Sequence, residues 1–314
     1  MRVKVLGSAA GGGFPQWNCA CSNCFAVRAG TFRGRARTQT QLAFSVNSKE
    51  WFLLNASPDL RAQILATPEL APPQGSRQSP IVGVFLTSAD ADTVTGLLHL
   101  RESTPLSIFS TPAVQRILKE ENSLFRVLNR ATPRAQWRGI LAQPQVGPAT
   151  DGDLASDASG DSSFRYSAVW LGGYYPDYLS CALRSKLATQ ESNVGLVLEH
   201  GGKRVFFAPS VARFSDELKT LAESSDLVFL DGTFWSDDEL IRATGSGKSA
   251  RDIGHVPLSG EDGLLQQFSK NVRGRRVLIH INNTNPILDE ESAEHRLVRE
   301  AGWEIAHDGM EFAL

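Results

Sequence analysis

Three cysteines lie close together near the start of the chain, in the pattern Cys19-x-Cys21-x-x-Cys24. Thiolates this close on one turn can face a single point, as the tetrahedral coordination of zinc requires, with sulfur–zinc distances of ~2.3 Å. A disulfide framework is disfavoured, because three of the four cysteines crowd into this turn. We interpret the fourth, Cys181, as a small buried residue. The pattern predicts a structural zinc site, with three free, partly buried thiols as the alternative.

A second group of polar residues follows strand-like apolar runs farther along the chain. Asp231 ends the run that begins at Leu227, and His280 ends the run that begins at Val277. Asp90 and Asp92 follow another such run and precede a helix, where either could be a helix cap. A single histidine at a strand end is more often a core or surface group, so these residues gain meaning only if the fold brings them together.

The elements that would position these residues alternate between strands and helices. Apolar runs bounded by turn signals predict strands at Val3–Leu6, Leu42–Val46, Trp51–Asn55, Ile81–Leu86, Leu106–Phe109, Val194–Glu199, Arg204–Ala208, Leu227–Leu230 and Val277–Ile281. Helices are predicted at Pro58–Ala66, Val94–Leu100, Pro112–Arg130, Ser215–Ser224, Gly260–Ser269 and Ser292–Ala301. Gln143–Ser163 is rich in turn-forming residues and reads as an exposed loop. The succession favours two sheets covered by helices, in an α/β fold.

Composition restricts the classes of protein that this chain can belong to. Its 314 residues are 41% hydrophobic and 8% aromatic, which is enough to fill a sizeable core. The formal net charge of −2 predicts no general attraction to nucleic acid or to an anionic membrane. No apolar run approaches the ~20 residues of a membrane span, and the N-terminal run is too short for a signal peptide. We therefore expect a cytoplasmic protein.

The segment after the strand at Ile81–Leu86 has the outline of a known metal-binding motif. It resembles the His-x-His-x-Asp-His motif of metallo-β-lactamase-fold hydrolases, followed by the usual small residue, Gly96. The motif positions are occupied, in order, by Ser88, Asp90, Asp92 and Thr93. None of the three histidines is present, so the motif is degenerate.

Longer stretches resemble the PqqB family of pyrroloquinoline quinone (PQQ) biosynthesis. They are Val5–Cys19, Leu54–Arg61, Gly96–Glu102, Asp231–Asp238, His280–Pro286 and His307–Met310. The resemblance implies one metallo-β-lactamase-like αββα sandwich over residues 1–314. It also implies iron- and oxygen-dependent hydroxylation of a peptide-derived tyrosine. The sequence departs from the family at Asp92-Thr93, where the family usually has Asp-His.

The same resemblance implies roles for single residues. Asp92, Asp231 and His280 would hold a cleft iron as a set of one histidine and two carboxylates. His255, in a Gly-His element like that of the tRNase Z branch, would be a fourth ligand or an acid/base. In related phosphodiesterases with the same cysteine turn, a histidine three residues after the last metal-ligand histidine completes the zinc site. That position is Asn283 here, with His255 and water as rivals.

Other functions remain open on the sequence. A metal-poor carrier would hold PQQ or its precursor in the cleft that corresponds to the active site of the hydrolases. Arg37 and Arg61 would pair with carboxylates of the ligand. A paralogue acting on another peptide is a further alternative. A hydrolytic two-metal site is disfavoured, because the first metal would keep only Asp90 and the bridging Asp231. The expected partner is a small peptide or an amino-acid-derived precursor, and the oligomeric state, including a homodimer, stays open.

The cysteine turn yields the first test. The protein should purify with about one tightly held zinc per chain, because structural zinc contributes directly to folding. Cys21→Ser should lower both the zinc content and the melting temperature, measured by elemental analysis and calorimetry. Unchanged zinc in this variant would contradict the assignment.

Overall fold

Apolar residues on successive strands face two different layers. In β2 (Gln41–Ser45), Leu42 and Phe44 point into a core between two sheets, whereas Ala43 packs beneath helices on the outer face. This is the period-two alternation of a strand that is buried on both sides. The chain therefore forms sheets that need a covering layer on each face.

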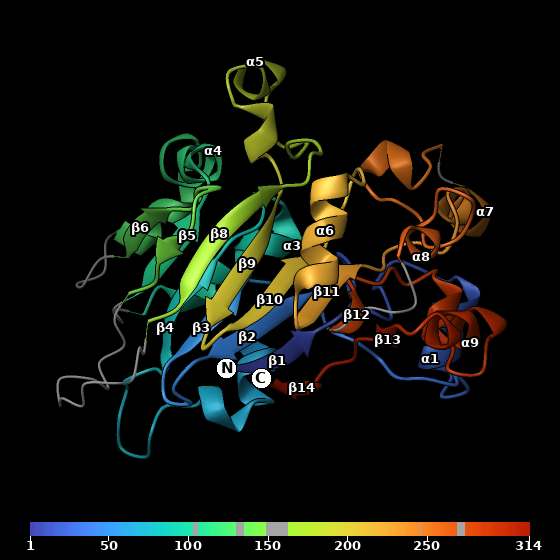
Figure 1. Cartoon of the computed structure of the whole chain (residues 1–314), viewed down its shortest axis with the longest axis horizontal. Coiled ribbons are helices and arrows are strands. Elements are labelled where there is room, and N and C mark those ends of the chain that lie inside the picture. The colour runs from blue at the N-terminus through green and yellow to red at the C-terminus, as the bar shows by residue number, and fades with distance from the viewer. Residues whose placement is uncertain (103–105, 130–134, 149–162, 246, 269–273) are drawn as a thin grey trace.

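The computed structural model describes residues 1–102, 106–129, 135–148, 163–245, 247–268 and 274–314. Within these residues, two seven-stranded sheets pack face to face, with helices on both outer faces (Figure 1). The first sheet has the order β14 (Glu311–Ala313), β1 (Arg2–Gly7), β2, β3 (Trp51–Leu54), β4 (Ile81–Phe85), β5 (Ser107–Ser110), β6 (Gln136–Gly139). The second has the order β13 (Glu304–Ile305), β12 (Arg275–Ile279), β11 (Leu227–Asp231), β10 (Lys203–Ala208), β9 (Val194–His200), β8 (Arg165–Trp170), β7 (Gln145–Val146).

The helices cover the two outer faces. Residues of α2 (Leu60–Leu65), α3 (Ala91–Val94) and α4 (Pro112–Arg116) pack on the first sheet. Residues of α1 (Ser22–Arg28), α6 (Asp216–Ser224), α8 (Leu264–Gln267) and α9 (Ala293–Glu300) pack on the second. The remaining helices are α5 (Cys181–Arg184), which projects at the top of Figure 1, and α7 (Glu239–Thr244). The predicted αββα fold class is confirmed.

The core between the sheets is aromatic. Phe85 and Phe109 of the first sheet stack with ring centroids 4.1 Å apart. Phe164, which immediately precedes β8 of the second sheet, meets Phe44 and Phe52 edge-on at 5.2 and 4.9 Å. Such edge-on and stacked pairs are favourable beyond the area that they bury. Phe164 therefore packs the second sheet against two aromatic rings of the first.

The strands that end near the candidate residues are mostly parallel to their neighbours. Strands β3 to β6 run parallel in one sheet, and β10 to β13 run parallel in the other. Backbone bridges Ala9–Ile281 and Ser88–Asn193 join the segments that follow or flank these strands. The carboxyl ends of strands from both sheets consequently meet, and this is where the polar residues lie.

Several predicted elements differ from those observed. The long helix at Pro112–Arg130 is broken: α4 passes into a wider π-type turn at Ile117–Glu121, and a 3₁₀ segment follows at Leu124–Asn129. The break falls at Asn122, whose side-chain oxygen accepts from the backbone N–H of Leu124 at 3.1 Å. Asparagine competes in this way for backbone groups and so favours helix ends. Arg130 lies outside the described residues.

The predicted boundaries are inaccurate elsewhere too. The helix predicted at Gly260–Ser269 is reduced to α8, and Ser269 lies outside the described residues. Strand β7 falls within the predicted loop Gln143–Ser163, of which residues 149–162 lie outside the described part. Cys181 was wrongly interpreted as buried: it is exposed, at the first position of α5.

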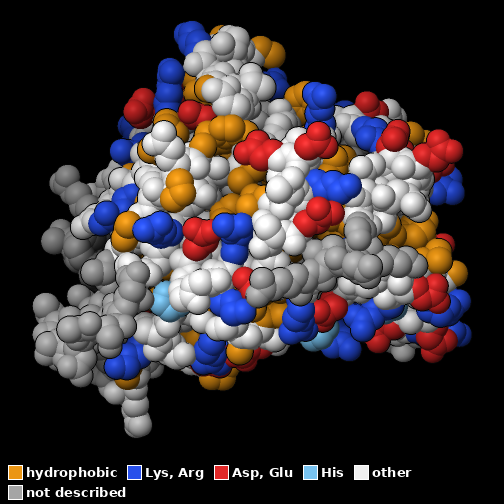
Figure 2. All heavy atoms as spheres, in the orientation of Figure 1, with side chains coloured by type: hydrophobic (Ala, Val, Ile, Leu, Met, Phe, Trp, Pro, Cys, Tyr) orange, Lys and Arg blue, Asp and Glu red, His pale blue; other side chains and the backbone are white. Residues whose placement is uncertain are grey.

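The surface shows no segregation of charge on the face drawn in Figure 2, where acidic and basic side chains are interspersed. In the described parts of the chain, no helix has the length and apolarity that a membrane crossing requires.

A matched pair of leucine substitutions tests the inter-sheet core. Leu198 in β9 is fully buried in that core, whereas Leu65 at the end of α2 is 70% exposed. Leu198→Ala should lower the free energy of unfolding by about 2–5 kcal/mol, because it removes buried methyl groups and leaves a cavity. Leu65→Ala should change it by no more than about 0.5 kcal/mol. Urea denaturation measures both, and equal effects would contradict this packing.

Candidate metal centres

The three clustered cysteines converge on one point. Cys19 and Cys21 precede α1, and Cys24 lies within it, so that their sulfur atoms all lie within 4.8 Å of one another. The backbone N–H of Gln16 points at the Cys24 sulfur, at 3.4 Å. Burial raises the pKa of the Cys24 thiol to about 11. Three thiolates at this spacing need a cation, and the donor set is the one that structural zinc takes.

Asn283 faces the thiol cluster. Its side-chain nitrogen lies 3.2, 3.6 and 3.4 Å from the sulfurs of Cys19, Cys21 and Cys24. Half a turn of the amide would present the oxygen of Asn283 in the same place, since the two ends are nearly equal in size. The backbone oxygen of Asn283 also accepts from Asn23, at 3.2 Å. The side chain thus stands where a fourth ligand would stand, whereas the rival His255 belongs to a second cluster.

That second cluster joins Asp231, His255 and His280, whose ligand atoms lie within 4.8 Å of one another. Asp231 ends β11 and is fully buried. Its carboxylate accepts from the backbone N–H of Val211 at 2.8 Å and from Nδ1 of His255 at 2.7 Å. It also accepts from the backbone N–H and hydroxyl of Thr233, at 3.0 and 2.6 Å. Burial alone would raise the pKa of Asp231, but the neighbouring His255 outweighs it and holds that pKa below its usual range.

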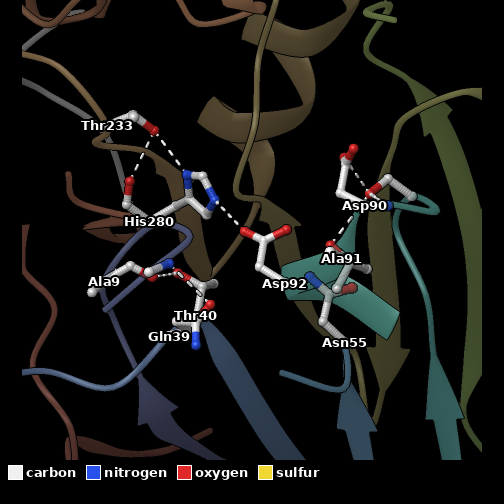
Figure 3. Close-up of polar contacts among 12 residues, drawn as sticks. Ala9, Gln39, Thr40, Asn55, Asp90, Ala91, Asp92, Thr233 and His280 are labelled. Atoms are coloured by element: carbon white, nitrogen blue, oxygen red, sulfur yellow. Dashed lines mark hydrogen bonds and ion pairs between the residues drawn. The ribbon is translucent and has the colours of Figure 1, made fainter. Parts of the chain in front are cut away.

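His280 is held by both its side chain and its backbone. Its φ of 61° lies in the left-handed region, which is uncommon outside glycine and marks functional positions. Its Nδ1 lies 2.9 Å from the hydroxyl of Thr233, and its Nε2 lies 3.3 Å from Asp92 (Figure 3). A hydroxyl that donates its only proton to Asp231 can accept from Nδ1–H of His280. Thr233 therefore leaves Nε2 of His280 pointing at Asp92.

The Asp92–His280 contact favours the charged form of both side chains. Burial would lower the pKa of His280, but the hydrogen bond and charge of Asp92 raise it. Burial would likewise raise the pKa of Asp92, but His280 keeps it low. A metal that takes Nε2 of His280 must displace this proton, so metal uptake should strengthen as the pH rises.

The degenerate motif lies beside this cluster, because its Asp92 contacts His280. Asp90 stands at the start of α3, but its carboxylate turns to Ser88, whose hydroxyl donates to it at 2.7 Å. Ser88 also contacts the Thr93 hydroxyl at 3.2 Å. Burial, and then the charge of Asp92, raise the pKa of Asp90 to about 6. These residues offer hydroxyl and carboxyl oxygens in place of imidazoles.

A cavity of ≈ 690 Å³ opens over these groups. Asp90, Asp92, His255 and His280 line it, as do Tyr174 and Tyr175. Gly11 passes directly beneath Asp92, where an added Cβ would lie 3.2 Å from the carboxylate. A side chain at this position would require the Asp92 carboxylate to shift by a few tenths of an ångström.

The two predicted anion-binding arginines lie elsewhere. Arg37 is buried and donates to the backbone oxygen of Ala306 at 3.1 Å, and Arg61 is exposed on α2. Neither lines the cavity. Arg184 and Lys248 line it instead.

Sequence reasoning missed Thr233 and Arg184. A hydroxyl two residues after the strand-end Asp231 was a usable signal for Thr233. Arg184 lies in α5, for which the sequence predicted neither a helix nor a motif.

The chain matches the model of the β-lactamase superfamily domain over residues 50–281. It is 41% identical to coenzyme PQQ synthesis protein B of Methylorubrum populi, over the full length of both chains. It is also 41% identical to the protein of the same name from Xanthomonas campestris pv. campestris, again over all of both chains. The crystal structure of Zn²⁺-bound PqqB from Methylobacterium extorquens superposes with a TM-score of 0.88 at 39% identity, with complete coverage of both chains.

The fold and the site therefore define a protein of the metallo-β-lactamase superfamily. Within that superfamily, the chain belongs to the coenzyme PQQ synthesis protein B (PqqB) family.

The Thr233 hydroxyl yields a test of the cleft. Thr233→Val keeps the shape but removes the group that connects Asp231, His255 and His280. It should weaken cleft metal binding by about 10- to 100-fold, as the loss of a ligand-orienting hydrogen bond does. Zinc at the cysteines should remain, and Thr233→Ser should restore binding. Metal titrations measure these effects, and full affinity in Thr233→Val would refute the role.

Proposed function

We propose that this protein is an iron- and oxygen-dependent hydroxylase that acts on a peptide-derived tyrosine during PQQ biosynthesis. One observation carries the proposal: two imidazoles and a carboxylate, from His255, His280 and Asp231, converge beside a large cavity. Non-heme iron enzymes that activate oxygen use this donor set and keep open positions for oxygen and substrate. Membership of the PqqB family supports a role in PQQ biosynthesis.

Each cleft residue has a distinct task in this proposal. When bound, iron would supply the activation of oxygen, held by Asp231, His255 and His280 with Asp92 alongside. Asp90, with its pKa raised to about 6, can hold or release a proton near neutral pH. Inserting one oxygen atom into an aromatic C–H bond while the other becomes water consumes two electrons and two protons. An external reductant must supply these electrons.

The cavity suits a tyrosine that carries carboxylates. Its volume of ≈ 690 Å³ falls in the range of small-ligand sites. Tyr174 and Tyr175 supply aromatic side chains to its lining. Arg184, which pairs with Asp177 at 2.9 Å, and Lys248 supply positive charge. These two cations take the role that the sequence had given to Arg37 and Arg61.

The cysteine cluster is proposed to hold a structural zinc. Cys19, Cys21, Cys24 and Asn283 would complete four positions, leaving none for chemistry. The relative solved with zinc supports this element. Crowded free thiols also favour a reducing compartment, which supports placing the protein in the cytoplasm.

A carrier of PQQ or its precursor is the second candidate. It is favoured by the degenerate motif, in which Ser88, Asp90 and Thr93 replace all three imidazoles. A cavity of this size would suit a bound ligand without any reaction. A paralogue that modifies another peptide would use the same cleft.

Metal content and turnover separate these candidates. Protein purified without oxygen should hold zinc plus iron, and should hydroxylate a tyrosine-containing peptide when oxygen and a reductant are added. His280→Ala and Asp231→Ala should lose iron and activity but keep zinc, while His200→Ala, on the strand end away from the cavity, should match the wild type. Zinc alone, with tight PQQ binding and no turnover, would support the carrier.

Thr93 yields a prediction of its own. It lines the cavity where the family usually has histidine, and a hydroxyl is a poor substitute for an imidazole. Thr93→His should therefore raise iron retention after anaerobic loading and dialysis, by about tenfold or more. Iron per chain is the measurement, with Thr93→Ser as the control. If the wild type already retains one iron per chain and Thr93→His retains no more, then Thr93 does not weaken the cleft metal site.

A further inference from the structure

A second, smaller cavity of ≈ 190 Å³ lies apart from the cleft, and among the described residues none lines both. Its polar lining consists of Arg37, Glu290, His295, Arg299 and His307. His295 and Arg299 come from α9, and His307 comes from the turn before β14. We call this cavity the Arg37 pocket.

Arg37 is the buried element of this pocket. Arg37 is only 4% exposed, and its Nη1 donates to the backbone oxygen of Ala306 at 3.1 Å. Its Nε is buried and has no hydrogen-bond partner among the described residues. In a planar guanidinium, the N–H groups of Nε and Nη2 point in parallel from one edge. That edge is the one that pairs with both oxygens of a carboxylate or phosphate.

Two histidines and a second arginine line the pocket with Arg37. His295 donates its Nδ1–H to the backbone oxygen of Ile287 at 2.9 Å, and His307 donates its Nδ1–H to the backbone oxygen of Asp308 at 3.0 Å. In a neutral imidazole this leaves Nε2 as an acceptor, so the attraction for an anion comes from the two arginines. Arg299 is exposed at the rim and forms no ion pair within the described parts of the chain.

The nearby carboxylates are engaged elsewhere. Glu290 pairs with Arg35 at 3.3 Å. Asp308 accepts from the backbone N–H and hydroxyl of Thr38, at 2.7 and 2.8 Å, and from Ser8 at 2.8 Å. Neither forms a hydrogen bond with Arg37 in the described structure. Burial lowers the pKa of Arg37 to about 10, and the charges of Asp308 and Glu290 offset only part of that effect.

We propose that the Arg37 pocket binds an oxyanion group, a carboxylate or a phosphate, through the guanidinium of Arg37. Leaving a guanidinium buried with an unmade hydrogen bond costs free energy, and a bound anion removes that cost. Arg299 at the rim adds attraction, and Glu290 opposes it. The site is independent of the cleft metal.

Titration calorimetry on the full-length, zinc-loaded protein tests this, with inorganic phosphate and acetate as separate probes at low ionic strength. At least one should bind with a stoichiometry of about one per chain, and the tighter one identifies the ligand as a phosphate or a carboxylate. Arg37→Gln should weaken binding by at least about tenfold, the effect of losing a charge-assisted hydrogen bond. Arg37→Lys should weaken it too, because lysine lacks the parallel pair of donors.

Two exposed rim residues give effects of opposite sign. Arg299→Gln should weaken binding, and Glu290→Gln should strengthen it. Arg33→Gln, at an exposed arginine paired with Glu291, and His280→Ala, in the cleft, should leave it unchanged. These variants keep the test decisive if Arg37→Gln fails to fold. The absence of saturable binding, an equal loss in Arg33→Gln, or the same sign at both rim residues would overturn the proposal.

Discussion

The burial of the Asp231 carboxylate is the constraint on which the cleft depends. A charge with no exposure to water must be compensated by hydrogen bonds, since an isolated buried carboxylate is very costly. Here the donors come from Val211, Thr233 and His255, which lie in separate segments of the chain. Satisfying one side chain therefore fixes the ends of β10 and β11 and the position of His255. Because four donors share this task, the loss of one weakens the compensation of the buried charge without abolishing it.

The end of β12 connects the two candidate metal centres. His280 faces Asp92 and Thr233, and three residues later Asn283 faces the thiols. Between them, Ile281 pairs with the segment at Ser8 and Ala10, close to the glycines that line the cavity. A zinc that orders the cysteine turn would therefore also hold the strand end that carries His280. This gives a structural zinc an indirect part in shaping the cleft.

The sequence was informative where chemistry depends on local spacing. The cysteine pattern and the polar strand ends at Asp231 and His280 could be identified, because a turn and a strand end place such groups predictably. The positions of the Arg37 and Arg61 side chains could not be predicted from the sequence, because the direction of a long side chain depends on the tertiary structure around it. Strand β8 was also missed, because alternating exposed and buried residues in Arg165–Trp170 give a weaker signal than a continuous apolar run.

Anomalous diffraction at the zinc and iron edges, from crystals grown and loaded with iron without oxygen, tests the central claim most directly. The account predicts a zinc peak among Cys19, Cys21 and Cys24, and an iron peak among Asp231, His255 and His280. A cleft that holds no iron under these conditions, or an iron bound away from these three residues, would contradict it.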